Sequence, residues 1–94
     1  PKLDDFQPIT RDFAFIVDSD MPAEKLVNAA IQSDSHITNV IVFDAFDMGD
    51  GKKSVAFTIT ITPTENMSDS DLQKIQESVI SGVEKKCNAQ IRDK

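Results

Sequence analysis

The sequence has few of the residues on which catalytic and metal sites usually depend: one cysteine, one histidine and three glycines among 94 residues. The single Cys87 cannot form a disulfide within the chain, and it fits a reducing, cytoplasmic compartment. Without a C-x-x-C pair, metal transport is an improbable role. The lone His36 stands in a polar turn with no evident partner for nucleophilic catalysis. We therefore expect no catalytic residue, no metal ligand and no cofactor in this chain.

Basic residues and long apolar runs are also scarce. Ten Lys and Arg against 16 Asp and Glu give a net charge of −6. This balance argues against a domain held on DNA or RNA by general attraction to phosphates, but leaves room for a small site that reads bases. No apolar run approaches the roughly 18 residues of a membrane span, and residues 1–5 do not resemble a signal peptide. We expect no membrane partner and no DNA partner. The missing initiator Met indicates that residues 1–94 are one domain of a longer chain.

The periodicity of the apolar residues predicts six elements. Strands are expected over 12–18, 37–46, 53–62 and 89–92, with one helix beginning at Pro22 and another following Ser68 and ending near Cys87. The order βαββαβ predicts an α+β, ferredoxin-like fold, in which two helices cover one face of a four-stranded antiparallel sheet. The other face of such a sheet stays open.

Both helices show an apolar stripe and the second shows clear end signals. The first is expected to bury Leu26, Val27, Ala30 and Ile31, and the second Leu72, Ile75, Val79, Val83 and Cys87. Ser68 with Asp71 is a weaker relative of the capping box, and Met67 with Leu72 could form a hydrophobic staple. Asn88 stands where a left-handed residue ends a helix.

The segment from residue 42 to 61 predicts a hairpin whose turn lies at 47–51, and its outer face is unusual for a sheet. Asp44 and Phe46 share one face, and so do Ser54 and Ala56. A ring among polar groups is typical of sheets that bind single-stranded RNA. Phe46 could stack on a base, and the Asp44 carboxylate could accept hydrogen bonds from guanine N1–H and N2–H₂. The small side chains of Ala14 and Ala56 would leave room for a base.

Two adjacent lysines follow the turn of this hairpin. Lys52 and Lys53 are expected at the mouth of the open face, where they could contact phosphates. Periodicity alone leaves other roles open. The ring at Phe46 could be covered by a neighbouring domain, so that the face would serve protein interaction. A regulatory domain of the same fold that binds an amino acid is a further alternative, although the segment between the first strand and helix has no glycine.

Several spaced motifs resemble one family. They are residues 6–18 (FQPITRDFAFIVD), 42–46 (VFDAF), 51–56 (GKKSVA) and 88–92 (NAQIR). In this order they resemble the ferredoxin-fold anticodon-binding domain that closes the β subunit of bacterial phenylalanyl-tRNA synthetases. The resemblance covers about residues 6–92.

The resemblance implies that the open face holds the anticodon of tRNA-Phe, whose first base is a guanine. The family's contact positions fall on Asp44 and Phe46, with Ala14 and Ser54 beside them. Arg11 and Arg92 look like charged anchors at strand ends. The implied partners are the anticodon stem–loop of tRNA-Phe, the α subunit and the remaining β-subunit domains. ATP and Mg²⁺ would act in the α subunit, and the domain itself would be non-catalytic.

Overall fold

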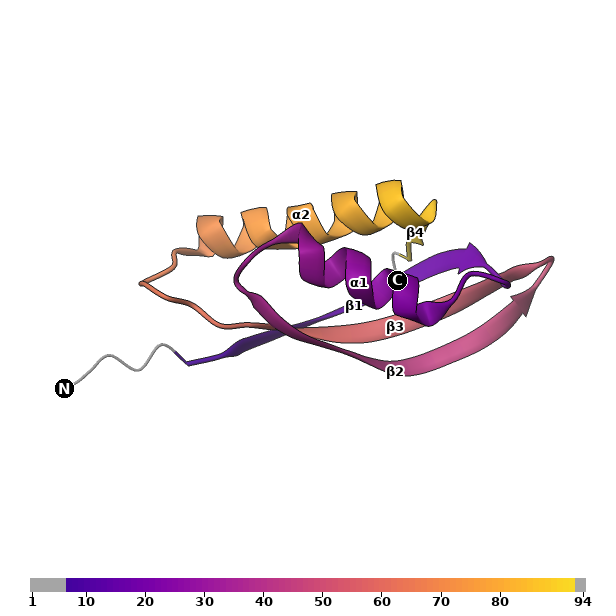
Figure 1. Ribbon diagram of the computed structural model, residues 1–94, viewed down its shortest axis with the longest axis horizontal. Helices are drawn as coiled ribbons and strands as arrows, with labels where there is room; N and C mark the ends of the chain where they lie inside the picture. The colour runs from indigo at the N-terminus through magenta and orange to yellow at the C-terminus, as the bar shows by residue number, and fades with distance from the viewer. Residues whose placement is uncertain (1–6, 93–94) are drawn as a thin grey trace.

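Both helices lie on the same face of a four-stranded sheet (Figure 1). The computed structural model describes residues 7–92, so residues 1–5 and Phe6 of the first motif lie outside the described range. The elements are β1 (Ile9–Asp18), α1 (Ala23–Ser33), β2 (Ile37–Gly49), β3 (Lys52–Ile61), α2 (Asp69–Cys87) and β4 (Gln90–Ile91). The strand order is β2-β3-β1-β4, and each neighbouring pair is antiparallel. This arrangement confirms the predicted ferredoxin-like fold.

The core lies between the sheet and the helices. Val55, Phe57, Ile59 and Ile61 of β3 alternate toward the helices, and none of these side chains is exposed to solvent. The rings of Phe15 and Phe57 stack at a centroid distance of 5.6 Å and an interplanar angle of 11°. The alternate residues of β3 face the other side, which no helix covers. The chain thus buries one face of the sheet and leaves the other free for function.

Strands β1 and β2 extend further than the sequence pattern predicts, whereas β3 is shifted by one residue and β4 is shorter than the predicted 89–92. Strand β1 begins at Ile9 because residues 9–11 continue the ladder with residues 61–59 of β3. In the hairpin, Gly49 pairs with Lys52, so the turn is only Asp50-Gly51 and not the whole of 47–51. Both turn residues have positive φ, 57° and 74°. Two-residue hairpin turns of this kind favour Asp-Gly, because both positions need the left-handed region.

The first helix differs from its prediction in two respects. It begins at Ala23, and Pro22 is the N-cap residue, without a side-chain hydrogen bond. Its buried residues include Ala29, whereas Ile31 is 40% exposed. The cause is close contact with α2: a Cβ at Gly82 would lie 3.3 Å from the Ser33 Cβ and 3.9 Å from the Ala29 carbonyl oxygen. The small residues of α1 therefore turn toward α2, and Ile31 turns outward.

Both ends of α2 agree with the sequence prediction. The Ser68 Oγ accepts a hydrogen bond from the Asp71 amide, and the Asp71 carboxylate accepts one from the Ser68 amide, each at 3.1 Å. Asn88 ends the helix with φ 50°. The predicted stripe is buried at Ile75, Val79, Val83 and Cys87, while Leu72 is partly buried. The capping box and the left-handed end are confirmed.

The Cys87 thiol should react slowly with iodoacetamide in the folded protein. Its side chain is 2% exposed. Burial raises the pKa of the thiol, and the nearby charges of Lys25 and Lys86 offset only part of this effect. Because the thiolate is the reactive form, a raised pKa and low access both slow alkylation. Mass spectrometry at pH 8 should show slow labelling in buffer and rapid labelling in urea. Equal rates in the two conditions would contradict the burial.

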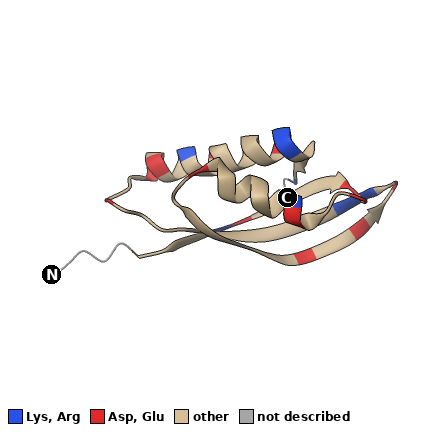
Figure 2. Cartoon of the chain, in the orientation of Figure 1, with Lys and Arg blue, Asp and Glu red and all other residues tan. Residues whose placement is uncertain are grey.

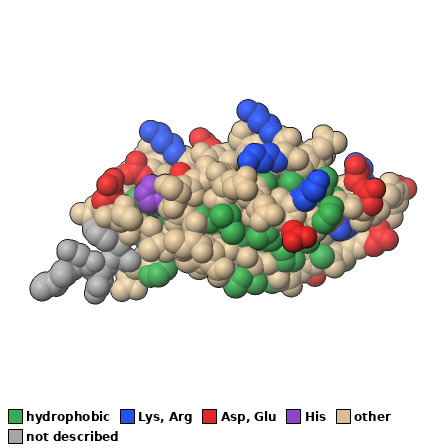
Figure 3. Space-filling model, in the orientation of Figure 1, with side chains coloured by type: hydrophobic (Ala, Val, Ile, Leu, Met, Phe, Trp, Pro, Cys, Tyr) green, Lys and Arg blue, Asp and Glu red, His purple; other side chains and the backbone are tan. Residues whose placement is uncertain are grey.

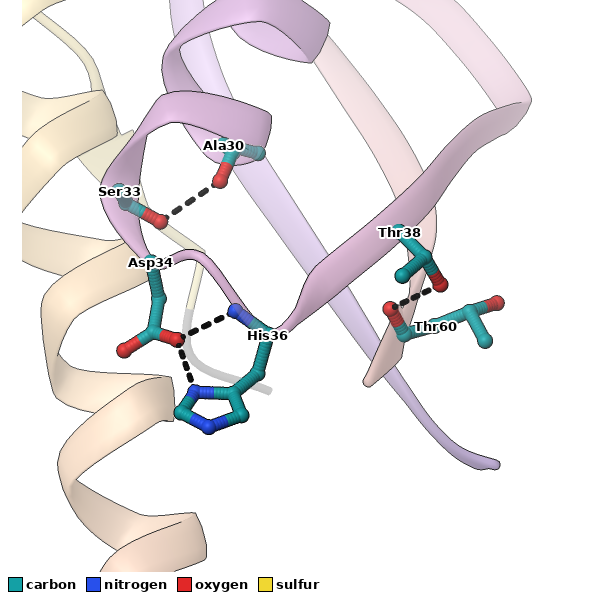
Figure 4. A network of polar contacts seen from close by, with 6 residues as sticks. All are labelled: Ala30, Ser33, Asp34, His36, Thr38 and Thr60. Carbon is teal, nitrogen blue, oxygen red and sulfur yellow. Dashed lines mark hydrogen bonds and ion pairs between the residues drawn. The ribbon is translucent and has the colours of Figure 1, made fainter. Parts of the chain in front are cut away.

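The single histidine, His36, lies in the turn between α1 and β2 (Figure 4). The Asp34 Oδ1 atom accepts a hydrogen bond from the His36 amide at 2.8 Å and lies 2.7 Å from the His36 Nδ1. Asp34 is a partner that the sequence did not indicate, but the pairing is local and closes the turn. Within residues 7–92, no three His, Cys, Asp or Glu side chains are grouped to hold a metal ion. No helix in this range is long and apolar enough to cross a membrane.

Candidate nucleic-acid interface

The open face brings together four of the side chains selected from the sequence. Ala56 of β3 pairs with Ala14 on one side and with Asp44 on the other. In the next row of this face, Ser54 pairs with Ile16 and with Phe46. Ala14, Asp44, Phe46 and Ser54 therefore share one patch of the sheet, as predicted.

A β-bulge in β2 turns Asp44 and Phe46 outward. Val40 and Val42 face the core, because they pair with Ile59 and Phe57. Strict alternation from Val42 would carry Asp44 to the same, helix-covered face. The register shifts between Val42 and Asp44, and Phe43 is the extra residue. At the bulge the alternation of side chains between the two faces is shifted by one residue. Asp44 and Phe46 therefore lie on the open face.

Phe43 itself belongs to this face, and sequence reasoning did not select it. Its ring is 58% exposed, more than any other large apolar side chain in the described range. It is the extra residue of the bulge and precedes Asp44, which pairs with Ala56. Ile41, Phe46 and Met48 of the same strand are also exposed, and Figure 3 shows apolar side chains on the side of the molecule where β2 runs. Alternation sets neighbouring residues on opposite faces, so the sequence pattern does not predict that Phe43 and Asp44 share the open face.

Arg92 crosses the open face from the other edge. Its amide donates a 2.7 Å hydrogen bond to the Ala14 carbonyl, which continues the β4 ladder. Its Nη1 donates to the Ser54 Oγ at 3.2 Å, and its Cζ lies 5.3 Å from the centre of the Phe46 ring. Ser54 is only 2% exposed. The expected role of Arg92 as a strand-end anchor was therefore incomplete, because its side chain lies within the patch.

A hollow of about 410 Å³ lies beside these side chains. Its lining comes from all four strands of the sheet and from α2. The residues are Asp12, Phe13, Ala14, Phe43, Ala56, Ile80, Ile91 and Arg92. The paired Ala14 and Ala56 have the smallest side chains among these residues. The Asp12 Oδ1 accepts a 2.7 Å hydrogen bond from Thr58. The hollow thus combines apolar surface with one carboxylate, from Asp12, and one guanidinium, from Arg92.

The two lysines of the hairpin point in different directions. The Lys52 Nζ lies 2.7 Å from the Asp18 Oδ1, at the hairpin end of the open face. Such an exposed pair is weak, so Lys52 can exchange Asp18 for a phosphate. Lys53 pairs with the buried Val17 on β1 and lies on the opposite side of the sheet. Figure 2 shows basic residues near the hairpin end of β3 and acidic residues along β2.

The comparisons with known proteins fit this geometry. The family model of the ferredoxin-fold anticodon binding domain matches residues 5–92. This chain belongs to that family. The domain is 41% identical to the phenylalanine–tRNA ligase β subunit of Bradyrhizobium diazoefficiens, 40% identical to that of Cereibacter sphaeroides and 39% identical to that of Ruegeria pomeroyi. These matches cover 96–97% of this chain but 12% of each relative. The anticodon-binding domain therefore spans about an eighth of the length of the relatives it matches.

Proposed function

We propose that this domain recognises the anticodon of tRNA-Phe as part of a phenylalanine–tRNA ligase β subunit. The observation that carries the proposal is the placement of Asp44 and Phe46 side by side on the open face, beside the paired Ala14 and Ala56. The family match and the names of the relatives support the same conclusion. The domain binds RNA in this proposal and catalyses nothing itself.

Stacking on Phe46 would hold the first anticodon base. The ring is 44% exposed, and the flat guanidinium of Arg92 already lies 5.3 Å from its centre. A ring that accepts a planar cation over its face can accept a planar base in the same way. Arg92, held in place by its hydrogen bond to the buried Ser54, would border the base and fix its plane.

Asp44 would read the identity of that base. Guanine presents N1–H and N2–H₂ as adjacent donors, and one carboxylate can accept both hydrogen bonds. Adenine lacks this pair of donors, so the site would prefer guanine. Lys52, on the open-face side, would contact a phosphate, whereas Lys53 on the other side would add only long-range attraction.

The rest of the ligase would supply most of the affinity. With a net charge of −6, the domain gains little from general attraction to phosphates. In this proposal the α subunit and the other β-subunit domains hold the body of the tRNA. ATP and Mg²⁺ act in the α subunit, and the whole enzyme is cytoplasmic.

Asp44→Asn should weaken binding of a tRNA-Phe anticodon stem–loop about tenfold, because it removes a charge-assisted hydrogen bond. Fluorescence anisotropy with a labelled stem–loop measures the affinity. The same variant should lose the preference for guanine over adenine at the first anticodon position. With inosine there, which keeps N1–H but lacks the N2 amino group, the wild type should bind more weakly than with guanine.

Asp50→Asn is the matched control. It makes the same charge change in the hairpin turn, at a left-handed position that Asn also adopts, and should leave binding unchanged. If Asp44→Asn kept full affinity and guanine preference, the proposed mechanism would be wrong. Stabilisation of the domain by free amino acids but not by RNA would favour a regulatory role instead.

A further inference from the structure

Strand β2 forms a long free edge of the sheet. It is the longest strand in the described range, Ile37–Gly49, and it pairs with β3 on one side only. Among residues 7–92 no further strand lies beside it, as Figure 1 shows, whereas the opposite edge is β4, which has two residues. A free edge presents unpaired N–H and C=O groups to which another chain can add a strand, and proteins usually keep such edges short, charged or covered.

The ladder shows which backbone groups face this free edge. The His36 carbonyl oxygen accepts a 2.8 Å hydrogen bond from the Thr62 amide, so Thr62 turns its backbone groups toward β2. Backbone direction alternates along an antiparallel strand, so Thr58 also turns toward β2, where its partner is Ile41. The residues on either side of Ile41 pair with the intervening positions of β3 and turn their N–H and C=O groups to the free edge; they are Val40 and Val42.

The middle of this edge lacks the usual protection. Residues 37–43 (ITNVIVF) include no charged residue, no proline and no glycine, and five of the seven are β-branched. Such a run is the sequence signature of a segment that pairs readily with another strand. Residues 39–42 also lie between two register shifts and pair regularly with β3, so the edge is straight enough to take a partner there.

We propose that this edge binds an extended protein segment, which adds to the sheet as a further strand beside residues 39–42. The main chain of the segment would bond to the free backbone groups of Val40 and Val42, and strand addition of this kind is a general way for a sheet to bind a peptide. The open face stays free, because an added strand extends the sheet sideways. Strand addition therefore does not depend on the anticodon contacts proposed above.

Charge favours a basic partner. From residue 26 to residue 51 the sequence contains no lysine or arginine. This stretch includes all of β2 and most of α1, the helix that packs on it, and its acids are Asp34, Asp44, Asp47 and Asp50 (Figure 2). Because acids stand on both sides of residues 37–43, a segment with an apolar centre and Lys or Arg at each end complements the edge. A second copy of this chain, with a net charge of −6, would bring the same acids and be repelled.

The source that we propose for this segment is the remainder of the β subunit. The chain spans 12% of each relative, so most of such a subunit lies outside it. This source rests on the proposed function, in which the domain is part of a phenylalanine–tRNA ligase β subunit. Loss of RNA binding in Asp44→Asn tests that function separately, and a negative result there would leave the free edge of β2 unchanged.

Hydrogen exchange of the Val40 and Val42 amides reports whether the edge is occupied. In the domain alone both should exchange fast, while the amides of Asn39 and Ile41, which bond to β3, should exchange slowly. In the full-length β subunit that carries this domain, the Val40 and Val42 amides should exchange about tenfold more slowly or slower still. NMR measures the domain, and mass spectrometry with electron-transfer fragmentation measures the subunit. Equal rates for these two amides in the domain and in the subunit would overturn the proposal.

A synthetic peptide checks the chemistry of the partner. The probe has an alternating Val-Thr centre with two lysines at each end. At about ten times its Kd it should slow exchange at Val40 and Val42 about tenfold, because these amides exchange only while the peptide is away. The same peptide with glutamates in place of the lysines should bind more weakly, and one with a central proline should not bind. Protection of the same amides without peptide, together with a dimer in sedimentation, would assign the edge to a second copy and refute the proposed occupant.

The variant test compares Val42→Pro with the matched control Val42→Ala. Proline is tolerated where the N–H of an edge strand faces outward, so Val42→Pro removes one edge donor and leaves the bonds to β3. It should lower the affinity for the peptide about fivefold, the usual worth of one hydrogen bond, whereas Val42→Ala keeps the donor and should bind like the wild type. Wild-type affinity of a Val42→Pro variant that melts normally would contradict strand addition. If this variant does not fold, the exchange rates of the wild type decide the question.

Discussion

Phe57→Ala should lower the free energy of unfolding by about 3–5 kcal/mol, the usual cost of removing a fully buried ring. Phe57 has no exposed surface and lies on β3, a strand that is paired on both sides. Its ring stacks on Phe15 and lies 6.0 Å from the centre of Phe13. Truncation leaves a cavity that neighbours on two strands cannot fill. Urea denaturation followed by circular dichroism measures the loss.

Phe46→Ala serves as the control for this prediction. The chemical change is the same, but the ring is 44% exposed on the other face. Its loss should cost about 1 kcal/mol or less, including the contact with Arg92. A domain of this size has roughly 5–15 kcal/mol of stability, so Phe57→Ala could unfold near 37 °C. Phe57→Leu, which keeps part of the volume, should fold and show a smaller loss. Equal losses for Phe57→Ala and Phe46→Ala would contradict the core described above.

Arg92→Ala should weaken binding of the anticodon stem–loop about 100-fold, since a hydrogen bond to a charged group is worth about 1.5–3 kcal/mol. We expect the largest effect on RNA binding at this residue because its guanidinium lies over the Phe46 ring and is held by Ser54 within the proposed base site. The free domain should change little in stability, since Arg92 is exposed and its cation–π contact is worth about 0.5–1 kcal/mol. Arg92→Lys should recover only part of the affinity, because an ammonium group lacks the flat guanidinium.

The salt dependence separates a base contact from a phosphate contact. For single strands, each lost phosphate contact reduces the slope of log K against log salt by about 0.7. Lys52→Ala should show this reduction together with a small loss of affinity. Arg92→Ala should show a large loss at every salt concentration and a smaller change in slope. If the two variants showed the same slope change, Arg92 would be a phosphate contact, and its proposed contact with the base would fail.

The fold was predictable because its signals are local. The alternation of β3, the Ser68–Asp71 capping box and Asn88 each depend on a few neighbouring residues, and all three are confirmed. The buried face of α1 was partly mispredicted because it depends on Gly82, which is far away in the chain. A helix pattern shows which residues are apolar, but it does not show which neighbour comes close enough to favour an alanine.

The candidate site was predictable only in part. The alternation of side chains and the motif resemblance both placed Asp44 and Phe46 with Ala14, and the register agrees. Two members of the patch were missed for physical reasons. Phe43 and Asp44 share the open face because of a bulge, whereas the alternation that sequence analysis relies on sets neighbouring residues on opposite faces. Arg92 follows a strand of two residues, too short to show which face its side chain will take.

The bulge at Phe43 also bears on how such a surface can evolve. If β2 kept all its residues but paired with β3 without the bulge, Asp44 would fall on the same face as Val42 and turn toward the core. The composition of the strand would hardly change, yet a carboxylate would be buried and the site would vanish. Point substitutions can therefore tune which base the domain prefers. Deletion of Phe43 alone would instead restore a regular ladder with Asp44 still opposite Ala56, so the acid and the Phe46 ring would keep their face while the exposed Phe43 ring would be lost.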